Sequence, residues 1–218
     1  MYPKLESIIR PSLDIWQDYL THPFITGLAD GTLAEDKFLN YLIQDTLYLR
    51  EYARVYAMAM YRSTSIAEIR AYYSILSFVN DGEGSFRLEW LEREGLDTLK
   101  VDAMPLKPAN RAYCDFMLQT AETEGVAGIL MAVLPCMFSY AWIFQKIAAQ
   151  YPESRESRYW PFIEGYISGE YEDDCRTWAA FAEERLQQLD EVELARMTDI
   201  FRQSSLYEAD FWDMAFEG

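Results

Sequence analysis

Histidine is almost missing from this sequence, in which His22 is the only one among 218 residues. A Ser-His-Asp or Cys-His arrangement, or a metal site with two histidine ligands, therefore cannot be built from one chain unless His22 itself takes part. His22 precedes Pro23 near the end of a predicted helix, where a capping or turn residue is expected. We therefore assign His22 a structural role and predict no metal site.

Cysteine and basic side chains are also few. The three cysteines, Cys114, Cys136 and Cys175, are widely spaced and form no CxxC pair, so we expect neither a disulfide framework nor a zinc site, and we predict a reduced, cytoplasmic location. The 36 acidic and 19 basic side chains give a net charge of -17, without a dense Lys/Arg cluster. Nucleic acids and anionic membranes are therefore not expected as partners. The start of the chain also shows no signal-peptide pattern.

Charge is absent from one long stretch, from Gly125 to Phe144. At roughly 1.5 Å per residue this stretch is long enough to span a bilayer as a helix. Its second half contains Pro135, Cys136 and Tyr140, and the rest of the chain has no comparable run. A helix that is apolar on every side is equally typical of the centre of a soluble bundle, so these residues alone leave both interpretations open.

Strand patterns are absent, because no period-two alternation is bounded by hairpin turns. Apolar residues instead recur at intervals of three and four from Leu5 to Leu20, which predicts a first helix ending before Pro23. The stretch from Gly27 to Leu33 indicates a turn. Further helices are predicted over about 34–62, 66–79, 84–94, 108–123, 126–149, 157–167, 170–188 and 191–216. The sequence therefore predicts an all-α protein with one domain over residues 1–218.

Cys136 follows Pro135 inside the apolar stretch. A proline within a helix removes one backbone hydrogen bond and tends to kink the helix, which can open space beside the thiol. Ser139 and Tyr140, three and four residues on, can share the face of Cys136. The alternative is that Cys136 is a small buried side chain of a core helix.

Two acidic residues lie among aromatic ones. Asp45 belongs to a helical stripe with three tyrosines, so it needs a basic partner in the protein or the hydrogen-bond donors of a ligand. Glu208 shares a face with Ser204, Phe211 and Trp212. Burial in such a wall raises a carboxyl pKa and suits it to proton transfer, whereas a solvated helix face is the alternative.

Several stretches together resemble the TenA/thiaminase II family in order and spacing, from roughly residue 10 to the end of the sequence. They are His22-Pro-Phe24-Ile, Leu28-Ala-Asp-Gly-Thr-Leu33, Tyr41-Leu-Ile-Gln-Asp45-Thr-Leu-Tyr48-Leu, Leu134-Pro-Cys136 with Ser139-Tyr140, Tyr166-Ile-Ser-Gly-Glu170-Tyr171, and Tyr207-Glu208-Ala-Asp-Phe211-Trp212. The Leu-Pro-Cys element is typical of the cysteine-containing branch. The stretch over about 78–110 matches only loosely.

The resemblance implies a haem-oxygenase-like multi-helix bundle, assembled as a homotetramer, that buries a pyrimidine in each subunit. It also displaces the transmembrane interpretation. It implies Cys136 as nucleophile, Glu208 as acid/base and Asp45 as anchor of the pyrimidine amino group and ring nitrogen. The remaining implied pocket residues are Tyr48, Tyr113, Tyr140, Tyr166 and Phe211.

The activity implied by the resemblance is that of an aminopyrimidine aminohydrolase or thiaminase II. Such an enzyme hydrolyses thiamin, or its 5-aminomethylpyrimidine breakdown products, to 4-amino-5-hydroxymethyl-2-methylpyrimidine for thiamin salvage. A thiol and a carboxyl group suffice for this reaction, so no cofactor and no metal are expected. The alternative is a pyrimidine-binding or regulatory protein on the same fold that does not turn its ligand over.

Overall fold

The protein is a helical bundle. The structure, a computed structural model, describes residues 2–81 and 84–217 and contains no strand within these ranges. The all-α prediction is confirmed. In chain order the helices are α1 (Pro3–Ile9), α2 (Leu13–Tyr19), α3 (Pro23–Asp30), α4 (Glu35–Arg62), α5 (Ile66–Asp81), α6 (Gly84–Arg93), α7 (Thr98–Asp102), α8 (Pro108–Thr123), α9 (Val126–Gln150), α10 (Trp160–Tyr166), α11 (Gly169–Leu186) and α12 (Glu191–Glu217), with short 3-10 helices η1 (Arg10–Ser12) and η2 (Pro152–Glu156).

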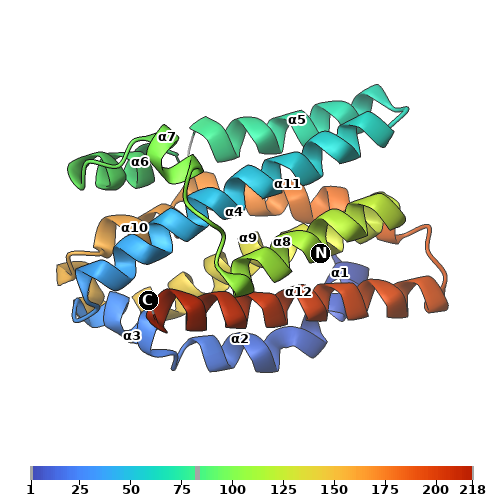
Figure 1. The fold of residues 1–218 in the computed structure, drawn as a ribbon. Coiled ribbons are helices and arrows are strands. Elements are labelled where there is room, and N and C mark those ends of the chain that lie inside the picture. The colour runs from blue at the N-terminus through green and yellow to red at the C-terminus, as the bar shows by residue number, and fades with distance from the viewer. Residues whose placement is uncertain (1, 82–83, 218) are drawn as a thin grey trace.

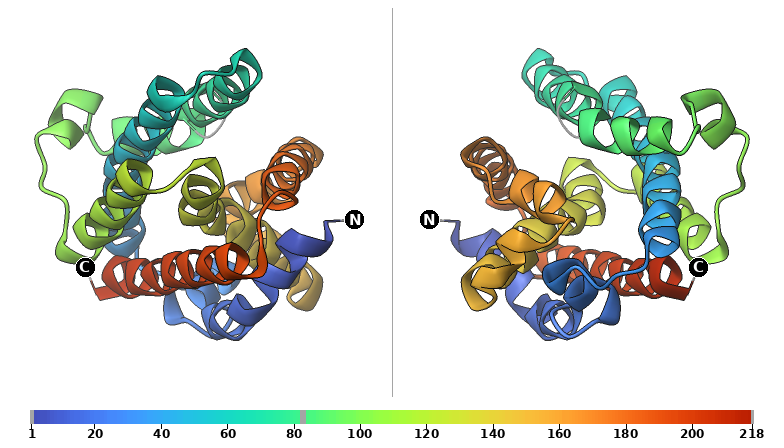
Figure 2. Two further views of the ribbon diagram at one scale, coloured as in Figure 1. Left: turned by 90° about the vertical axis from the view of Figure 1, so that its right-hand side faces the viewer. Right: turned by 90° about the vertical axis from the view of Figure 1, so that its left-hand side faces the viewer.

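Four long helices, α4, α8, α9 and α12, form the middle of the bundle (Figure 1). Helix α12 packs against α9, α8 and α4, and α4 also packs against α8. Helices α5 and α2 lie at opposite edges of the molecule in all three views (Figures 1 and 2). The four central helices carry seven of the eight predicted site residues, so their packing decides the geometry of the site.

Helix α9 contains the uncharged stretch of the sequence. In the part of the chain that the structure describes, it is the one helix long and apolar enough to cross a membrane by length and composition. However, 67% of its most apolar window is buried inside the bundle, against α12, α11, α8 and α10. The apolar character of α9 is therefore accounted for by its central position. The helix continues through Pro135.

The prediction for the first 33 residues is partly wrong. The first predicted helix is interrupted by η1, because Pro11 has no N–H for a helical hydrogen bond. Residues 27–30, predicted to form a turn, belong to α3. This helix begins with Pro23 at its first turn, and the His22 ring accepts a hydrogen bond from the Phe24 N–H (3.1 Å), which confirms a structural role for His22. It ends at Gly31, whose φ of 76° is left-handed.

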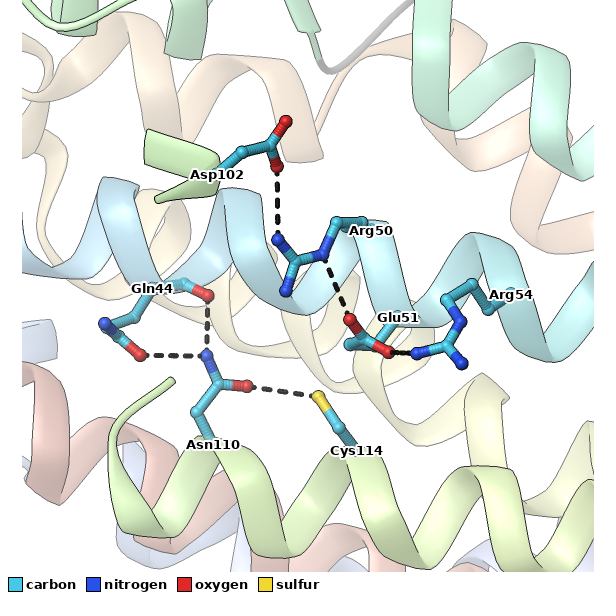
Figure 3. A network of polar contacts seen from close by, with 7 residues as sticks. All are labelled: Gln44, Arg50, Glu51, Arg54, Asp102, Asn110 and Cys114. Atoms are coloured by element: carbon cyan, nitrogen blue, oxygen red, sulfur yellow. Dashed lines mark hydrogen bonds and ion pairs between the residues drawn. The ribbon is translucent and has the colours of Figure 1, made fainter. Parts of the chain in front are cut away.

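A buried polar network holds α4 against α8 (Figure 3). The Asn110 amide donates to the Gln44 backbone carbonyl (2.7 Å) and to Gln44 Oε1 (3.1 Å), and its Oδ1 accepts from the Cys114 thiol (3.3 Å). Further along α4, Arg50 donates hydrogen bonds from Nε to Glu51 Oε1 (3.0 Å) and from Nη1 to Asp102 Oδ1 at the end of α7 (3.2 Å). Since Gln44 precedes Asp45, this network fixes the register of the helix that carries Asp45.

Asn110→Ala is expected to lower the free energy of unfolding by about 2 to 3 kcal/mol, because it removes two buried hydrogen bonds to Gln44 and the acceptor of the buried Cys114 thiol. Asn110 is fully buried, so water cannot replace the lost bonds. Urea unfolding measures the change, which should appear in the midpoint with an unchanged slope. Gln119→Ala, on an exposed position of the same helix, is the control and should cost less than about 0.5 kcal/mol. Equal costs for the two variants would contradict a stabilising role for the network.

Candidate active site

Glu208 of α12 is a buried acid with a strongly raised pKa. Its side chain is buried, and Oε1 accepts a hydrogen bond from the Tyr113 hydroxyl at 2.8 Å. The pKa of Glu208 is raised to about 8, mainly by burial and to a smaller extent by the negative charge of Asp45. Hydrogen bonds from the Tyr113 hydroxyl and the Cys136 thiol lower the pKa and so oppose part of this rise. Glu208 is therefore neutral at pH 7 and poised to exchange a proton near neutral pH.

Tyr113 joins three of the central helices. Its hydroxyl contacts Glu208 and lies 2.9 Å from Ser204 Oγ, one turn before Glu208 on α12. Ser204 in turn donates to the Ala132 carbonyl on α9 at 2.7 Å. These contacts connect α8, α12 and α9 at one level of the bundle. The position of the Glu208 carboxyl group is therefore set by neighbours that are themselves fixed.

Cys136 lies half-buried on α9, and its thiol is hydrogen-bonded to the Glu208 carboxyl group. Burial raises the pKa of Tyr48, Tyr113 and Tyr140 well above the usual value, and repulsion from Cys136 adds to the shift in each case. The three phenols are thus within electrostatic range of the sulfur. Cys114, by contrast, is buried in the α4–α8 network, where burial raises the pKa of its thiol to about 12 and makes it unreactive.

Asp45 of α4 is buried and paired with Arg87 of α6. Arg87 donates from Nε (2.8 Å) and from Nη2 (2.7 Å) to the same carboxylate oxygen, Oδ2. Burial raises the pKa of Asp45, and the charge and hydrogen bonds of Arg87 oppose that rise. The sequence left open whether a basic residue or a ligand would pair with Asp45, and in the structure a basic residue, Arg87, does so. The negative charge of Asp45 also contributes to the raised pKa of Glu208, so the two carboxyl groups lie within electrostatic range of each other.

Aromatic rings form the walls of the site. The Tyr48 ring lies 5.1 Å from the Tyr113 ring and 5.8 Å from the Phe211 ring, measured between centroids. On the α9 side, the Tyr140 ring lies 5.0 Å from that of Tyr166 on α10. These rings offer flat apolar faces from five helices, α4, α8, α9, α10 and α12. A planar heteroaromatic ring is the kind of ligand that such faces bind well.

Two further aromatic residues support this wall. Trp212 stacks against Tyr41, with centroids 5.7 Å apart and planes 9° apart, and the Tyr41 hydroxyl lies 3.2 Å from that of Tyr140. Trp212 also lies 4.9 Å from the Tyr140 ring. The orientation of Tyr140 is therefore held on two sides by residues of α4 and α12.

The structure brings the eight predicted residues together. Cys136, Glu208 and Tyr113 are in contact, and Asp45 acts electrostatically on Glu208 and Tyr140. The ring contacts connect the remaining residues, which are Tyr48, Phe211, Tyr140 and Tyr166. Within the described residues no group of three or more His, Cys, Asp or Glu side chains could hold a metal ion.

Sequence reasoning did not identify Arg87 as part of this site. The only signal was indirect, because a buried Asp45 needs a cation and the sequence does not say which one. Arg87 is 42 residues away on another helix, in the stretch where the family resemblance is loose. For Ser204, the sequence indicates only that it shares a helix face with Glu208, and it predicts no role for the hydroxyl.

Comparison with known proteins agrees with this geometry. An aminopyrimidine aminohydrolase from Helicobacter pylori is 31% identical over 211 residues, which cover 93% of this chain and 94% of that protein. An aminopyrimidine aminohydrolase from Halalkalibacterium halodurans is 28% identical and covers 96% and 94%. The TenA homologue protein from P. horikoshii OT3 has a similar structure, with a TM-score of 0.86, 26% identity and 98% coverage of both chains.

These likenesses confirm the predicted haem-oxygenase-like helical fold. The sequence profile of the TENA/THI-4/PQQC family matches residues 11–218, which is nearly the whole chain. The match includes every residue of the site described above. This chain therefore belongs to the TENA/THI-4/PQQC family.

Proposed function

We propose that this protein is a cysteine-dependent aminopyrimidine aminohydrolase of the thiaminase II type. It hydrolyses thiamin, or a 5-aminomethylpyrimidine derived from it, to 4-amino-5-hydroxymethyl-2-methylpyrimidine. The observation that carries the proposal is the contact between the Cys136 thiol and the buried, neutral Glu208 inside an aromatic wall. The likeness to two aminopyrimidine aminohydrolases over more than 90% of the chain supports it.

Asp45 and the aromatic rings bind the pyrimidine. The carboxylate of Asp45 accepts a charge-assisted hydrogen bond from the amino group of the substrate and so sets the orientation of the ring. Tyr48 and Phe211 on one side, with Tyr140 and Tyr166 on the other, contact its faces. Binding of this kind recognises the pyrimidine and leaves its 5-methylene substituent free to vary.

Cys136 and Glu208 carry the chemistry. The neutral Glu208 protonates a ring nitrogen while the Cys136 sulfur adds to a ring carbon, and the thiol proton passes to the carboxylate that has just formed. The electron-rich adduct then expels the leaving group from the methylene carbon, the thiazole as a neutral group or the amine with a proton from Glu208. Water adds at that carbon and gives its proton to Glu208 or to solvent. The sulfur then leaves with its bonding electrons, and the proton of the ring nitrogen passes to it, which restores the thiol and the aromatic ring. Because the thiol contacts Glu208 directly, a preformed thiolate is not required.

The Tyr113 hydroxyl assists this cycle. It stays bonded to Glu208 Oε1 at 2.8 Å and stabilises the carboxylate that exists between the two proton transfers. A protein that only bound a pyrimidine would gain nothing from a buried acid whose pKa is about 8 next to a thiol. The arrangement therefore favours turnover over simple binding.

Product analysis tests the proposal directly. The purified protein should convert both thiamin and the aminomethylpyrimidine to the hydroxymethylpyrimidine, with mass spectrometry showing one oxygen from water in the product. Comparing kcat/KM for the two substrates identifies the preferred leaving group. Tight binding of the pyrimidines without product formation would contradict the proposal and would favour a binding protein on the same fold.

A further inference from the structure

The buried ion pair between Arg87 and Asp45 is unusual for its position. The side chains of both residues are more than nine-tenths buried, and burying two charges costs free energy that a well-packed apolar pair would avoid. Such a pair indicates a use beyond stability when one partner lies among the residues of a binding site. Asp45 is such a partner, since it acts electrostatically on Glu208 and on Tyr140.

The geometry of the pair is one-sided. Nε and Nη2 of Arg87 both bond Oδ2 of Asp45, at 2.8 and 2.7 Å. Among the residues that the structure describes, no side-chain or backbone group donates a hydrogen bond to the second oxygen, Oδ1. A rigid guanidinium fork on one oxygen fixes the carboxylate plane and leaves the other oxygen as an acceptor.

The pair also sets the charge of the site. Burial alone favours a neutral Asp45, and a protonated carboxyl group accepts hydrogen bonds poorly. Arg87 opposes that tendency through its charge and its hydrogen bonds. Among the described residues, the titratable groups that interact electrostatically with Asp45 are Arg87 from α6, Glu208 from α12 and Tyr140 from α9. Arg87 is the cation of this group.

We infer that Arg87 is a positioning residue for Asp45, which fixes Oδ2 and keeps the carboxylate ionised so that Oδ1 accepts the amino group of a bound aminopyrimidine. This inference rests on the proposed function. Arg87 acts through Asp45, which binds the amino group of the pyrimidine and takes no part in the proton transfers or in the addition of the sulfur. We therefore expect the loss of Arg87 to weaken pyrimidine binding and to shift the pH range of binding, while kcat changes much less.

Arg87→Gln is the main test, with 4-amino-5-hydroxymethyl-2-methylpyrimidine as the probe. Calorimetry should show a dissociation constant raised about 10-fold to 100-fold, the range expected for loss of a hydrogen bond to a charged group. KM should rise while kcat changes by less than about threefold. Since Arg87 lowers the pKa of Asp45, its removal should move the acidic limb of kcat/KM to higher pH.

Two comparisons separate this role from a merely structural one. Arg87→Lys keeps the charge without the fork and should recover part of the affinity. Arg93→Gln removes an exposed arginine from the same helix and should leave binding and turnover unchanged. Wild-type affinity and pH profile in a folded Arg87→Gln variant would overturn the inference.

The double variant Asp45→Asn with Arg87→Gln keeps the test valid if Arg87→Gln alone does not fold. It replaces the buried ion pair with two neutral amides, which a folded core tolerates better than one unpaired charge. If Arg87 acts through Asp45, the double variant should bind no more weakly than Asp45→Asn alone. Additive losses would contradict the inference. Binding without turnover in the wild-type protein would instead contradict the proposed function and leave this test intact.

Discussion

Cys136→Ala is expected to lower kcat/KM for both pyrimidine substrates by on the order of 10,000-fold or more, because it removes the nucleophile on which the covalent route depends. Without the sulfur, expulsion of the leaving group has no adduct to start from. Substrate binding should change by less than about tenfold, since the aromatic walls and Asp45 stay in place. Single-turnover kinetics with product detection by mass spectrometry measure the loss.

The fold should survive this substitution. Cys136 is half-buried, and truncating a small side chain at such a position costs about 1 kcal/mol. Far-ultraviolet circular dichroism and a thermal scan should therefore match the wild-type protein closely. Cys175→Ala is the matched control, because it removes a half-buried thiol that lies on α11 beside Leu5 and Ile9 of α1, and it should keep full activity. Unchanged turnover in Cys136→Ala would show that the sulfur is not the nucleophile.

The sequence predicts the ends of a helix well where a proline at its start and a glycine just after it mark the same boundaries. The predicted helix over 108–123 is α8, because Pro108 begins it and Gly125 follows its end closely. Helix α7 was missed, since it has only 5 residues, buries only Val101 and therefore shows no apolar period. Residues 27–30 were assigned to a turn on the strength of the glycines, although Pro23 offered the stronger signal of a helix start.

The site was harder to predict than the fold. Local context alone left two alternatives open for each residue, core or reactive thiol for Cys136 and buried or solvated acid for Glu208. No periodic pattern says that these two residues, 72 positions apart on different helices, will meet. The family resemblance supplied that relation. It supplied no partner for Asp45, because Arg87 lies where the resemblance is loose. The homotetramer stays a prediction of the resemblance, since subunit contacts require a second chain.

Glu208→Gln is expected to lower kcat by about 100-fold to 10,000-fold, the usual effect of losing a general acid-base group. Glutamine keeps the shape of the side chain and can still contact Tyr113, but it has no proton to give to the pyrimidine. Wild-type activity should fall above about pH 8, where the Glu208 carboxyl loses its proton, and this limb should vanish in the variant. Asp199→Asn, an exposed acid-to-amide change on α12, is the control.

The same variant should be more stable than the wild-type protein, with a pH dependence of definite sign. The pKa of Glu208 rises from 4.5 in the unfolded chain to about 8 in the folded protein, mainly through burial. Between these values the folded state holds a proton that the unfolded state has lost, so the free energy of unfolding falls as the pH rises, by at most about 1.4 kcal/mol per pH unit. Below pH 4.5 both states are protonated and the penalty disappears.

Glu208→Gln has no such penalty, so its stability advantage should grow from pH 5 to pH 8 and then level off. Urea unfolding of both proteins at several pH values measures this difference. A constant difference across the range would mean that Glu208 is ionised in the folded protein, and the proton transfer to the pyrimidine would then need another donor. An advantage that grows with pH, together with lost turnover, would show that the bundle gives up stability to keep a neutral acid beside its thiol.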